Sequence, residues 1–326
     1  MPVVTHSAYQ PAVYLRNGHL QTILPSTLRR VPEVHYRRHQ LELPDGDFIS
    51  LDWALAGAAP GHRLGIISHG LEGSSDRPYV RGMARAFNRA GIDALAWNYR
   101  GCGGEPNRLP RAYHLGDTAD LATVIHHAIG QGYEEIFLTG FSAGGNVTLK
   151  YLGEAPGQVP PQVKRAAVFS VPTDLKAGSE NISRWQNRVY LRRFMASLRQ
   201  KMRDKAAQLP GHFDLTGLDD LRGFPEFDDR YTAPMHGFAS ADAYYAHAAS
   251  GRYLGGINRP TLLVNALNDP LLPPSCFPRE AAAASEFLYL ETPAAGGHVG
   301  FAEGRPDGEY YSERRAIHFL TSPVPG

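Results

Sequence analysis

The sequence predicts an α/β fold in which helices cover both faces of a mostly parallel β-sheet. Short apolar runs, typical of strands buried on both faces, alternate with amphipathic helical patterns along most of the 326 residues. Hydrophobic residues make up 43% of the chain and charged residues 20%, which fits a protein that buries a large core. We therefore expect residues 1–326 to form a single domain.

Eight segments have the composition of strands, and the first two are joined through Pro44-Asp45-Gly46, a hairpin signal. Helical patterns over residues 79–90 and 115–129 separate the strands that follow. Residues 1–35 are expected to form an arm that packs over the domain. The eight predicted strands are residues 34–43, 48–55, 64–68, 92–97, 136–141, 166–171, 261–264 and 287–290.

One segment, from about residue 172 to about residue 239, shows no strand pattern and is expected to be a helical cap inserted into the domain. Within it, residues 188–205 place five apolar side chains on one helix face and basic residues on the remainder. The basic face fits an ordinary solvated surface, which we favour, or a surface that attracts anionic lipid or an anionic substrate group. The five apolar positions are Leu191, Phe194, Met195, Leu198 and Met202.

Charge and cysteine content narrow the classes of protein. A net charge of +1 gives no global reason to expect nucleic acid or an anionic membrane as a partner. Cys102 and Cys276 are the only cysteines and show no C-x-x-C spacing, which favours a reducing compartment over a disulfide framework. The first residues do not have the pattern of a signal peptide, and no apolar run reaches the length of a transmembrane helix. We expect a cytoplasmic protein.

The strongest candidate for a nucleophile is Ser142, in the sequence Gly140-Phe141-Ser142-Ala143-Gly144. This Gly-x-Ser-x-Gly string follows a buried strand and leads into a helical pattern. Glycines on either side allow a sharp strand-to-helix turn that exposes the serine hydroxyl. The string alone is weak evidence, so the interpretation depends on finding a base, an acid and oxyanion donors elsewhere.

A base and an acid follow in the order that such a site requires. His298 lies among glycines after the last predicted strand, at the sheet edge where ligand sites of α/β folds form. Asp269 follows the penultimate strand, although Asn268-Asp269-Pro270 is also good turn chemistry. Asp174, after the strand next to the serine turn, is the alternative acid.

The oxyanion donors are expected to be the backbone N–H groups of Leu71 and Ala143. Leu71 lies in His69-Gly70-Leu71-Glu72-Gly73, directly after an early strand, and Ala143 follows the nucleophile. The chain order of serine, aspartate and histidine is that of α/β-hydrolases. We therefore predict an α/β-hydrolase fold with an eight-stranded sheet.

Several strings, including those that contain the site residues, resemble the YheT-like branch of α/β-hydrolases, which is related to the ABHD1, ABHD2 and ABHD3 group. The resemblance runs through nearly the whole chain and implies the triad Ser142, Asp269 and His298. Some eukaryotic relatives carry an N-terminal membrane anchor, and we expect none here. The strings are Asn17-Gly18-His19-Leu20-Gln21-Thr22, His69-Gly70-Leu71-Glu72-Gly73, Asn98-Tyr99-Arg100-Gly101-Cys102-Gly103, Gly140-Phe141-Ser142-Ala143-Gly144-Gly145-Asn146, Tyr231-Thr232-Ala233-Pro234, Asn268-Asp269-Pro270 and Gly297-His298-Val299-Gly300.

The residues and the resemblance together predict a serine hydrolase that cleaves carboxylic esters, from short-chain esters to acylglycerols, through an acyl-serine intermediate. An alcohol acyltransferase using the same intermediate and a non-catalytic binding protein are the alternatives. The expected substrate is a small ester with an apolar acyl chain, and peripheral lipid contact would be made through the cap.

We expect no metal or organic cofactor. Gly101-Cys102-Gly103-Gly104 does not complete a dinucleotide fingerprint, and His126-His127 lacks a further ligand at metal spacing. Asn17 and His19 either hold the N-terminal arm in place, which we favour, or line the pocket.

Overall fold

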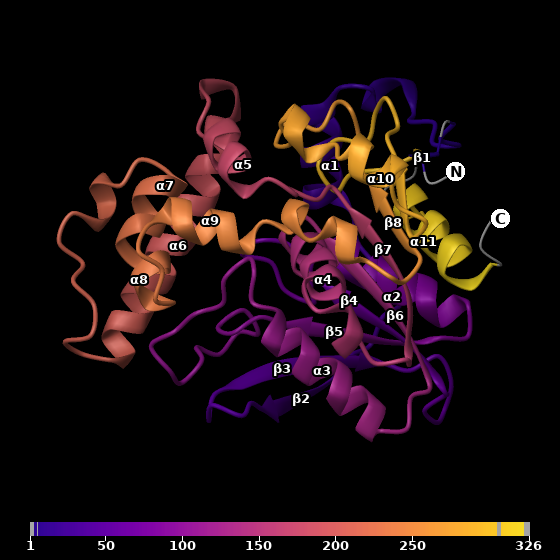
Figure 1. Ribbon diagram of the computed structural model, residues 1–326, viewed down its shortest axis with the longest axis horizontal. Helices are drawn as coiled ribbons and strands as arrows, with labels where there is room; N and C mark the ends of the chain where they lie inside the picture. The colour runs from indigo at the N-terminus through magenta and orange to yellow at the C-terminus, as the bar shows by residue number, and fades with distance from the viewer. Residues whose placement is uncertain (1–2, 5, 305–307, 323–326) are drawn as a thin grey trace.

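The computed structural model describes residues 3–4, 6–304 and 308–322 (Figure 1). Its centre is a nine-stranded sheet with the order β1-β9-β8-β7-β6-β4-β5-β3-β2. Only the β2–β3 and β3–β5 pairs are antiparallel, and every other pair is parallel. The strands are β1 Val3–Val4, β2 Arg37–Glu42, β3 Phe48–Ala54, β4 Arg63–Ser68, β5 Asp93–Asn98, β6 Glu135–Phe141, β7 Val163–Phe169, β8 Thr261–Val264 and β9 Leu288–Glu291.

All eight predicted strands are present, and the sheet has one more than expected. The additional strand is β1, where Val3 and Val4 pair in parallel with Leu290 and Glu291 of β9. Two residues are too few to produce a periodic pattern in the sequence, so this strand carries no signal of its own.

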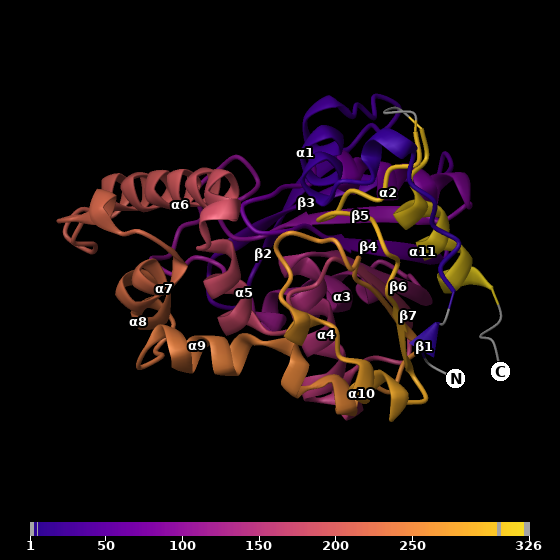
Figure 2. The same ribbon diagram turned by 90° about the horizontal axis from the view of Figure 1, so that it is seen from above.

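Helices cover both faces of the sheet, as the alternation predicts. On one face, α2 (Pro78–Arg89) and α11 (Tyr311–Thr321) pack against the strands through buried side chains such as Phe87 and Phe319. On the other face, α3 (Thr118–Gly130) and α4 (Ala143–Glu154) do so through Leu121 and Leu149. Of two further helices, α10 (Arg279–Ala283) packs against β9 and β1 at one edge of the sheet, and α1 (Gly18–Leu28) packs against α2 on the other side of the molecule (Figure 2).

The chain between β7 and β8 is helical and lies to one side of the sheet (Figure 1). It has its own small apolar clusters, one around Met195, Met202 and Phe227 and one around Leu175 and Tyr244. This helical segment continues to Ala248, past residue 239, because α9 packs against α5. Its helices are α5 Leu175–Ile182, α6 Arg188–Gln208, α7 Phe224–Phe227, α8 Ala233–Met235 and α9 Ala241–Ala248. Among the described residues, the helices include none with the length and apolarity needed to cross a bilayer.

Candidate active site

Ser142 stands at the sharp turn between β6 and α4. Its backbone φ is 53° and its ψ is −118°, a strained conformation for a residue with a side chain. The turn requires glycine on both sides. A Cβ at position 140 would lie 2.5 Å from the Gly144 carbonyl oxygen, and one at position 144 would lie 2.3 Å from that of Ser68.

The structure brings Ser142, His298 and Asp269 into one hydrogen-bonded chain. Ser142 Oγ lies 2.9 Å from Nε2 of His298, and Nδ1 of the same ring lies 2.8 Å from Oδ2 of Asp269. A carboxylate can only accept, so Nδ1 carries the hydrogen and Nε2 can take the hydroxyl proton. Asp269 is 6% exposed and also accepts the Leu271 N–H at 2.9 Å, which fixes the carboxylate.

Asp174, the alternative acid, has a different set of contacts. Its carboxylate accepts the N–H of Ala177 at 3.1 Å and caps the start of α5. The structure therefore places Asp269, and not Asp174, within hydrogen-bond distance of His298.

The loop after β4 approaches the serine from the other side. A Cβ at Gly70 would lie 3.3 Å from the Cβ of Ser142, so a side chain here would press on the serine. The N–H groups of Leu71 and Ala143 have no hydrogen-bond acceptor among the described residues, and both residues line the same cavity as Ser142. Two free amides beside a serine hydroxyl suit an oxyanion.

His69 holds this loop from within the core. Its Nε2 accepts the N–H of Tyr99 at 3.3 Å, so its Nδ1–H donates to the Gly70 carbonyl oxygen at 2.8 Å. Burial lowers the pKa of His69 to about 4, and the ring remains neutral at physiological pH. The Tyr79 hydroxyl accepts the Gly70 N–H at 2.9 Å and fixes the same peptide.

Glu72 is a site residue that the sequence did not single out. Its backbone has a φ of 51°, and its buried carboxylate accepts hydrogen bonds from Tyr113 (2.8 Å), Ser197 (2.6 Å) and Lys201 (2.7 Å). Ser197 and Lys201 belong to α6, so Glu72 ties the loop after β4, which we call the oxyanion loop (residues 69–73), to the cap. Although burial opposes the charge, the Lys201 ammonium holds the pKa of Glu72 below its usual value.

Thr22 is the second residue that was not singled out, although it closes the Asn17–Thr22 string. Its Oγ1 accepts the His298 N–H at 2.9 Å, so the N-terminal arm holds the histidine loop directly. Asn17 caps α1 through its side chain, and His19 Nδ1 lies 3.1 Å from the Tyr190 hydroxyl of α6. Both residues hold the arm in place, and neither lines the two cavities at Ser142.

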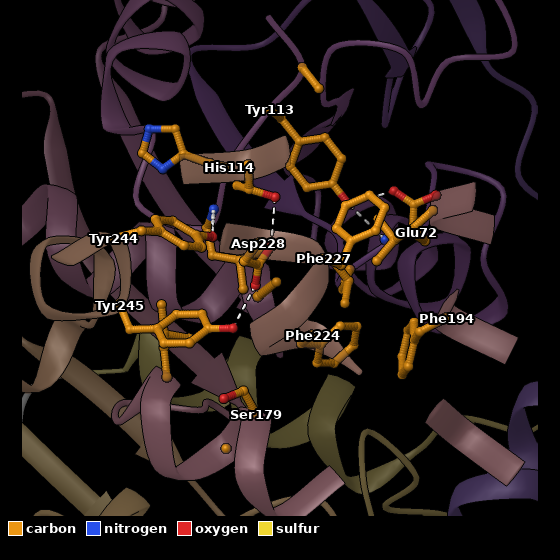
Figure 3. Close-up of a pocket in the computed structure, with 18 of the residues that line it drawn as sticks. Glu72, Tyr113, His114, Ser179, Phe194, Phe224, Phe227, Asp228, Tyr244 and Tyr245 are labelled. Carbon is orange, nitrogen blue, oxygen red and sulfur yellow. Dashed lines mark hydrogen bonds between the residues drawn. The ribbon is translucent and has the colours of Figure 1, made fainter. Parts of the chain in front are cut away.

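Two cavities meet at Ser142 and His298. The first, of about 140 Å³, runs between the sheet and the cap and is lined mainly by apolar and aromatic side chains, including Phe194, Phe224 and Phe227 (Figure 3). The second, of about 400 Å³, lies between α1, the start of α2 and the start of α6. An ester with its carbonyl group at Ser142 would therefore have one cavity for its acyl part and one for its alcohol part.

The first cavity also contains buried polar groups. Burial raises the pKa of Asp228 to about 6, even though Tyr245 and Thr232 donate hydrogen bonds to its carboxylate at 2.6 and 2.5 Å (Figure 3). Asp228 begins a π-helical turn, Asp228–Thr232, that joins α7 to α8. Burial lowers the pKa of His236 to about 4, so this ring is neutral.

The described residues contain no group of three or more His, Cys, Asp or Glu side chains that could hold a metal ion. Cys102 packs beside Lys201, with 3.2 Å between Nζ and Sγ, and burial raises the pKa of its thiol to about 11. Cys102 is thus a thiol in the neutral state and not a thiolate nucleophile.

Comparison with known proteins identifies the family of the chain. The family described as the alpha/beta hydrolase fold matches residues 66–305. YheT of Escherichia coli strain K12 is 36% identical over 293 residues, which cover 88% of this chain and 85% of YheT. The mouse phospholipase ABHD3 is 32% identical over 311 residues, covering 93% of this chain and 75% of the relative.

More distant matches extend the likeness. The human monoacylglycerol lipase ABHD2 is 27% identical over 93% of this chain and 76% of its own length. The solved structure of the Pyrococcus furiosus esterase Pf2001 shares the fold, with a TM-score of 0.56 at 16% identity, over 90% of this chain and 97% of the other.

The fold and the family match define an enzyme of the α/β-hydrolase class. Within that class, the chain belongs to the YheT-like branch, whose members include the relatives named above as a phospholipase and a monoacylglycerol lipase.

Proposed function

We propose that the protein is a serine hydrolase that cleaves carboxylic esters through an acyl–Ser142 intermediate. The observation that carries the proposal is the hydrogen-bonded chain from Ser142 through His298 to Asp269. Relatives that carry the names of a phospholipase and a monoacylglycerol lipase support an ester as the substrate.

In the acylation step, Ser142 Oγ attacks the ester carbonyl carbon while its proton passes to Nε2 of His298. Asp269 orients the ring and stabilises its positive charge. The N–H groups of Leu71 and Ala143 donate to the oxygen of the tetrahedral intermediate. As the intermediate collapses, the alcohol leaves with the proton from Nε2.

In the second step, His298 removes a proton from water, and the resulting hydroxide attacks the acyl carbon. The second tetrahedral intermediate uses the same two N–H donors. Its collapse releases the carboxylic acid and returns the proton to Ser142 Oγ.

The two cavities suggest where the acyl chain and the alcohol part of the ester bind. The cavity beneath the cap would hold the acyl chain because its walls are mainly apolar. The cavity between α1 and α6 would hold the alcohol, since it lies on the other side of Ser142 and His298. The free thiols of Cys102 and Cys276 fit a reducing compartment such as the cytoplasm.

Labelling with a fluorophosphonate probe tests the nucleophile. The wild-type enzyme should label, and Ser142→Ala should not. Ser275→Ala, which removes an exposed serine hydroxyl, serves as the matched control and should label like the wild type. Equal labelling of wild type and Ser142→Ala would show that the nucleophile is a different residue.

The acyl cavity can be tested at Leu198 of α6, which lines it. Leu198→Trp should fill part of the cavity and lower kcat/KM for long-chain p-nitrophenyl esters by about tenfold or more, because a displaced chain loses apolar contact. Acetate esters should be affected far less. Ala196→Trp adds the same side chain at an exposed position of α6 and should leave the chain-length profile unchanged.

A further inference from the structure

The exposed large apolar side chains of the protein come from a few neighbouring segments. Among the described residues there are eight, and Trp185, which is 75% exposed, is one of the most exposed. Seven lie in the N-terminal arm between residues 13 and 28 or between residues 185 and 189, where α6 begins. The eight are Val13, Tyr14, Leu20, Ile23, Leu28, Trp185, Val189 and Leu267.

Contacts join these segments into one surface, which we call the rim (residues 13–28, 184–193 and 267). Between α1 and α6, His19 Nδ1 lies 3.1 Å from the hydroxyl of Tyr190. Next to Leu267, Asn268 donates its side-chain N–H to the Arg16 carbonyl oxygen at 2.9 Å. Figure 2 shows α1 beside the near end of α6 on the same side of the molecule.

Positive charge is concentrated on and beside the rim. Residues 6–32 and 181–203 contain no Asp or Glu, although the whole chain has a net charge of only +1. These stretches contain seven exposed arginines, and six of them form no ion pair with a residue that the structure describes, whereas Arg203 pairs with Asp219. The six without an ion pair are Arg16, Arg30, Arg184, Arg188, Arg192 and Arg193.

The second cavity connects this surface to the catalytic serine. Ile23, Val189 and Arg193 line it and are exposed side chains of the rim. Ser142 and His298 line its inner end. A molecule held at the rim therefore lies at the entrance of a cavity that leads to the nucleophile.

We propose that the rim docks on the surface of an anionic lipid bilayer. Separate exposed apolar side chains, among them a tryptophan, enter the boundary between headgroups and acyl chains, while surrounding arginines attract anionic headgroups. The absence of carboxylates from both stretches favours an anionic surface over a mixed-charge protein partner. Docking in this way would bring lipid esters to the second cavity, a consequence that rests on the proposed esterase function.

Sedimentation of the full chain with lipid vesicles tests the proposal. Binding should be strong to vesicles of phosphatidylcholine and phosphatidylglycerol, weak to phosphatidylcholine alone, and reduced by added salt. Arg184→Gln/Arg188→Gln/Arg192→Gln should weaken binding by about tenfold or more, because each arginine contributes separately near an anionic surface. Val13→Ser/Leu28→Ser/Trp185→Ser should weaken it similarly by removing apolar contact.

The matched control removes the same charge elsewhere. Arg37→Gln/Arg252→Gln/Arg279→Gln changes three exposed arginines outside the rim and should bind vesicles like the wild type. None of the substituted rim residues lines either cavity at Ser142, so hydrolysis of a soluble short-chain ester without vesicles should be unchanged in all variants.

Three results would overturn the proposal: no vesicle binding by the wild type, equal binding by rim and control variants, or a wild-type dimer that the rim variants convert to a monomer without lipid. The last result would make the rim a subunit interface. Because vesicle binding is measured without substrate, failure of esterase activity would leave this test intact and would count against the proposed function alone.

Discussion

At the scale of single residues, Asp269 is the side chain whose role depends most on one contact. Asp269→Asn should leave the fold intact and lower kcat by orders of magnitude, because an amide no longer holds His298 in the tautomer that accepts the serine proton. Steady-state hydrolysis of a p-nitrophenyl ester measures the loss. Asp174→Asn is the control, since Asp174 only caps α5; a comparable loss of kcat in this variant would contradict the assignment.

Glu72 is the residue whose effect we expect to be indirect. Glu72→Gln removes the charge that Lys201 pairs with and weakens the tie between the oxyanion loop and α6. Complete loss of an oxyanion donor costs about 10²–10³ in kcat, so a displaced Leu71 N–H should cost about tenfold, with little change in KM.

Measuring kcat and KM separately shows whether Glu72 positions the oxyanion donor or only stabilises the fold. Glu226→Gln, which breaks the exposed pair between Glu226 and Arg222 of the cap, is the matched control and should leave both constants unchanged. If Glu72→Gln lowers only the melting temperature and leaves kcat intact, Glu72 does not position the loop.

At the scale of elements, the strained backbone conformations lie in the loops around the site. The five described non-glycine residues with positive φ are Glu72, Ser142, Ser170, Val299 and Phe301. They follow β4, β6, β7 and β9, at the sheet edge where the strands end, so the strain is concentrated where the loops carry the site. The Val299 N–H donates to Ser170 Oγ at 2.8 Å, which links two of these loops.

The turn between α7 and α8 gives the cap a pH dependence through Asp228. The folded protein holds the Asp228 proton more tightly than the unfolded chain, because burial raises its pKa from about 3.9 to about 6. Raising the pH from about 4 to about 6 therefore removes stability, by up to about 3 kcal/mol. This contribution is fully present below the lower pKa and is lost above the higher one.

Denaturant unfolding of wild type and Asp228→Asn at several pH values measures this effect. The free energy of unfolding of the variant, relative to that of the wild type, should increase between pH values of about 4 and 6 and level off above. Asp229→Asn, at the neighbouring exposed carboxylate, is the control. A difference that stays constant with pH would show that Asp228 does not titrate in this range.

At the scale of the whole molecule, the features that could be predicted are those that follow from the periodicity of the sequence and from the order of its motifs. The eight predicted strands, the helices near residues 79–90, 115–129 and 188–205, and the order of Ser142, Asp269 and His298 follow from local patterns and from one architecture. The contributions of Thr22 and Glu72 could not be predicted in this way, because each depends on a contact between distant segments. Thr22 and His298 are separated by 276 positions, and Glu72 and Lys201 by 129.

The boundary of α3 shows the same limit on a smaller scale. The apolar pattern predicts a helix from residue 115, but the helix begins at Thr118. The Leu115 N–H donates to the hydroxyl of Tyr244 in α9, at 3.0 Å. The residues just before α3 are thus held against the cap, and neither segment alone contains that information.

The N-terminal arm connects the sheet, the rim and the catalytic histidine, and Thr22 tests whether the arm is part of the site. Thr22→Val keeps the shape of the side chain but leaves the His298 N–H without its acceptor, which costs about 1–3 kcal/mol when the group is buried. Because the loss falls on the loop that carries the base, kcat should drop by about tenfold or more, while the far-ultraviolet circular dichroism stays unchanged. Thr22→Ser restores the hydroxyl and should recover most of the rate. Equal impairment of the Val and Ser variants would mean that the arm supports His298 through packing and not through this hydrogen bond.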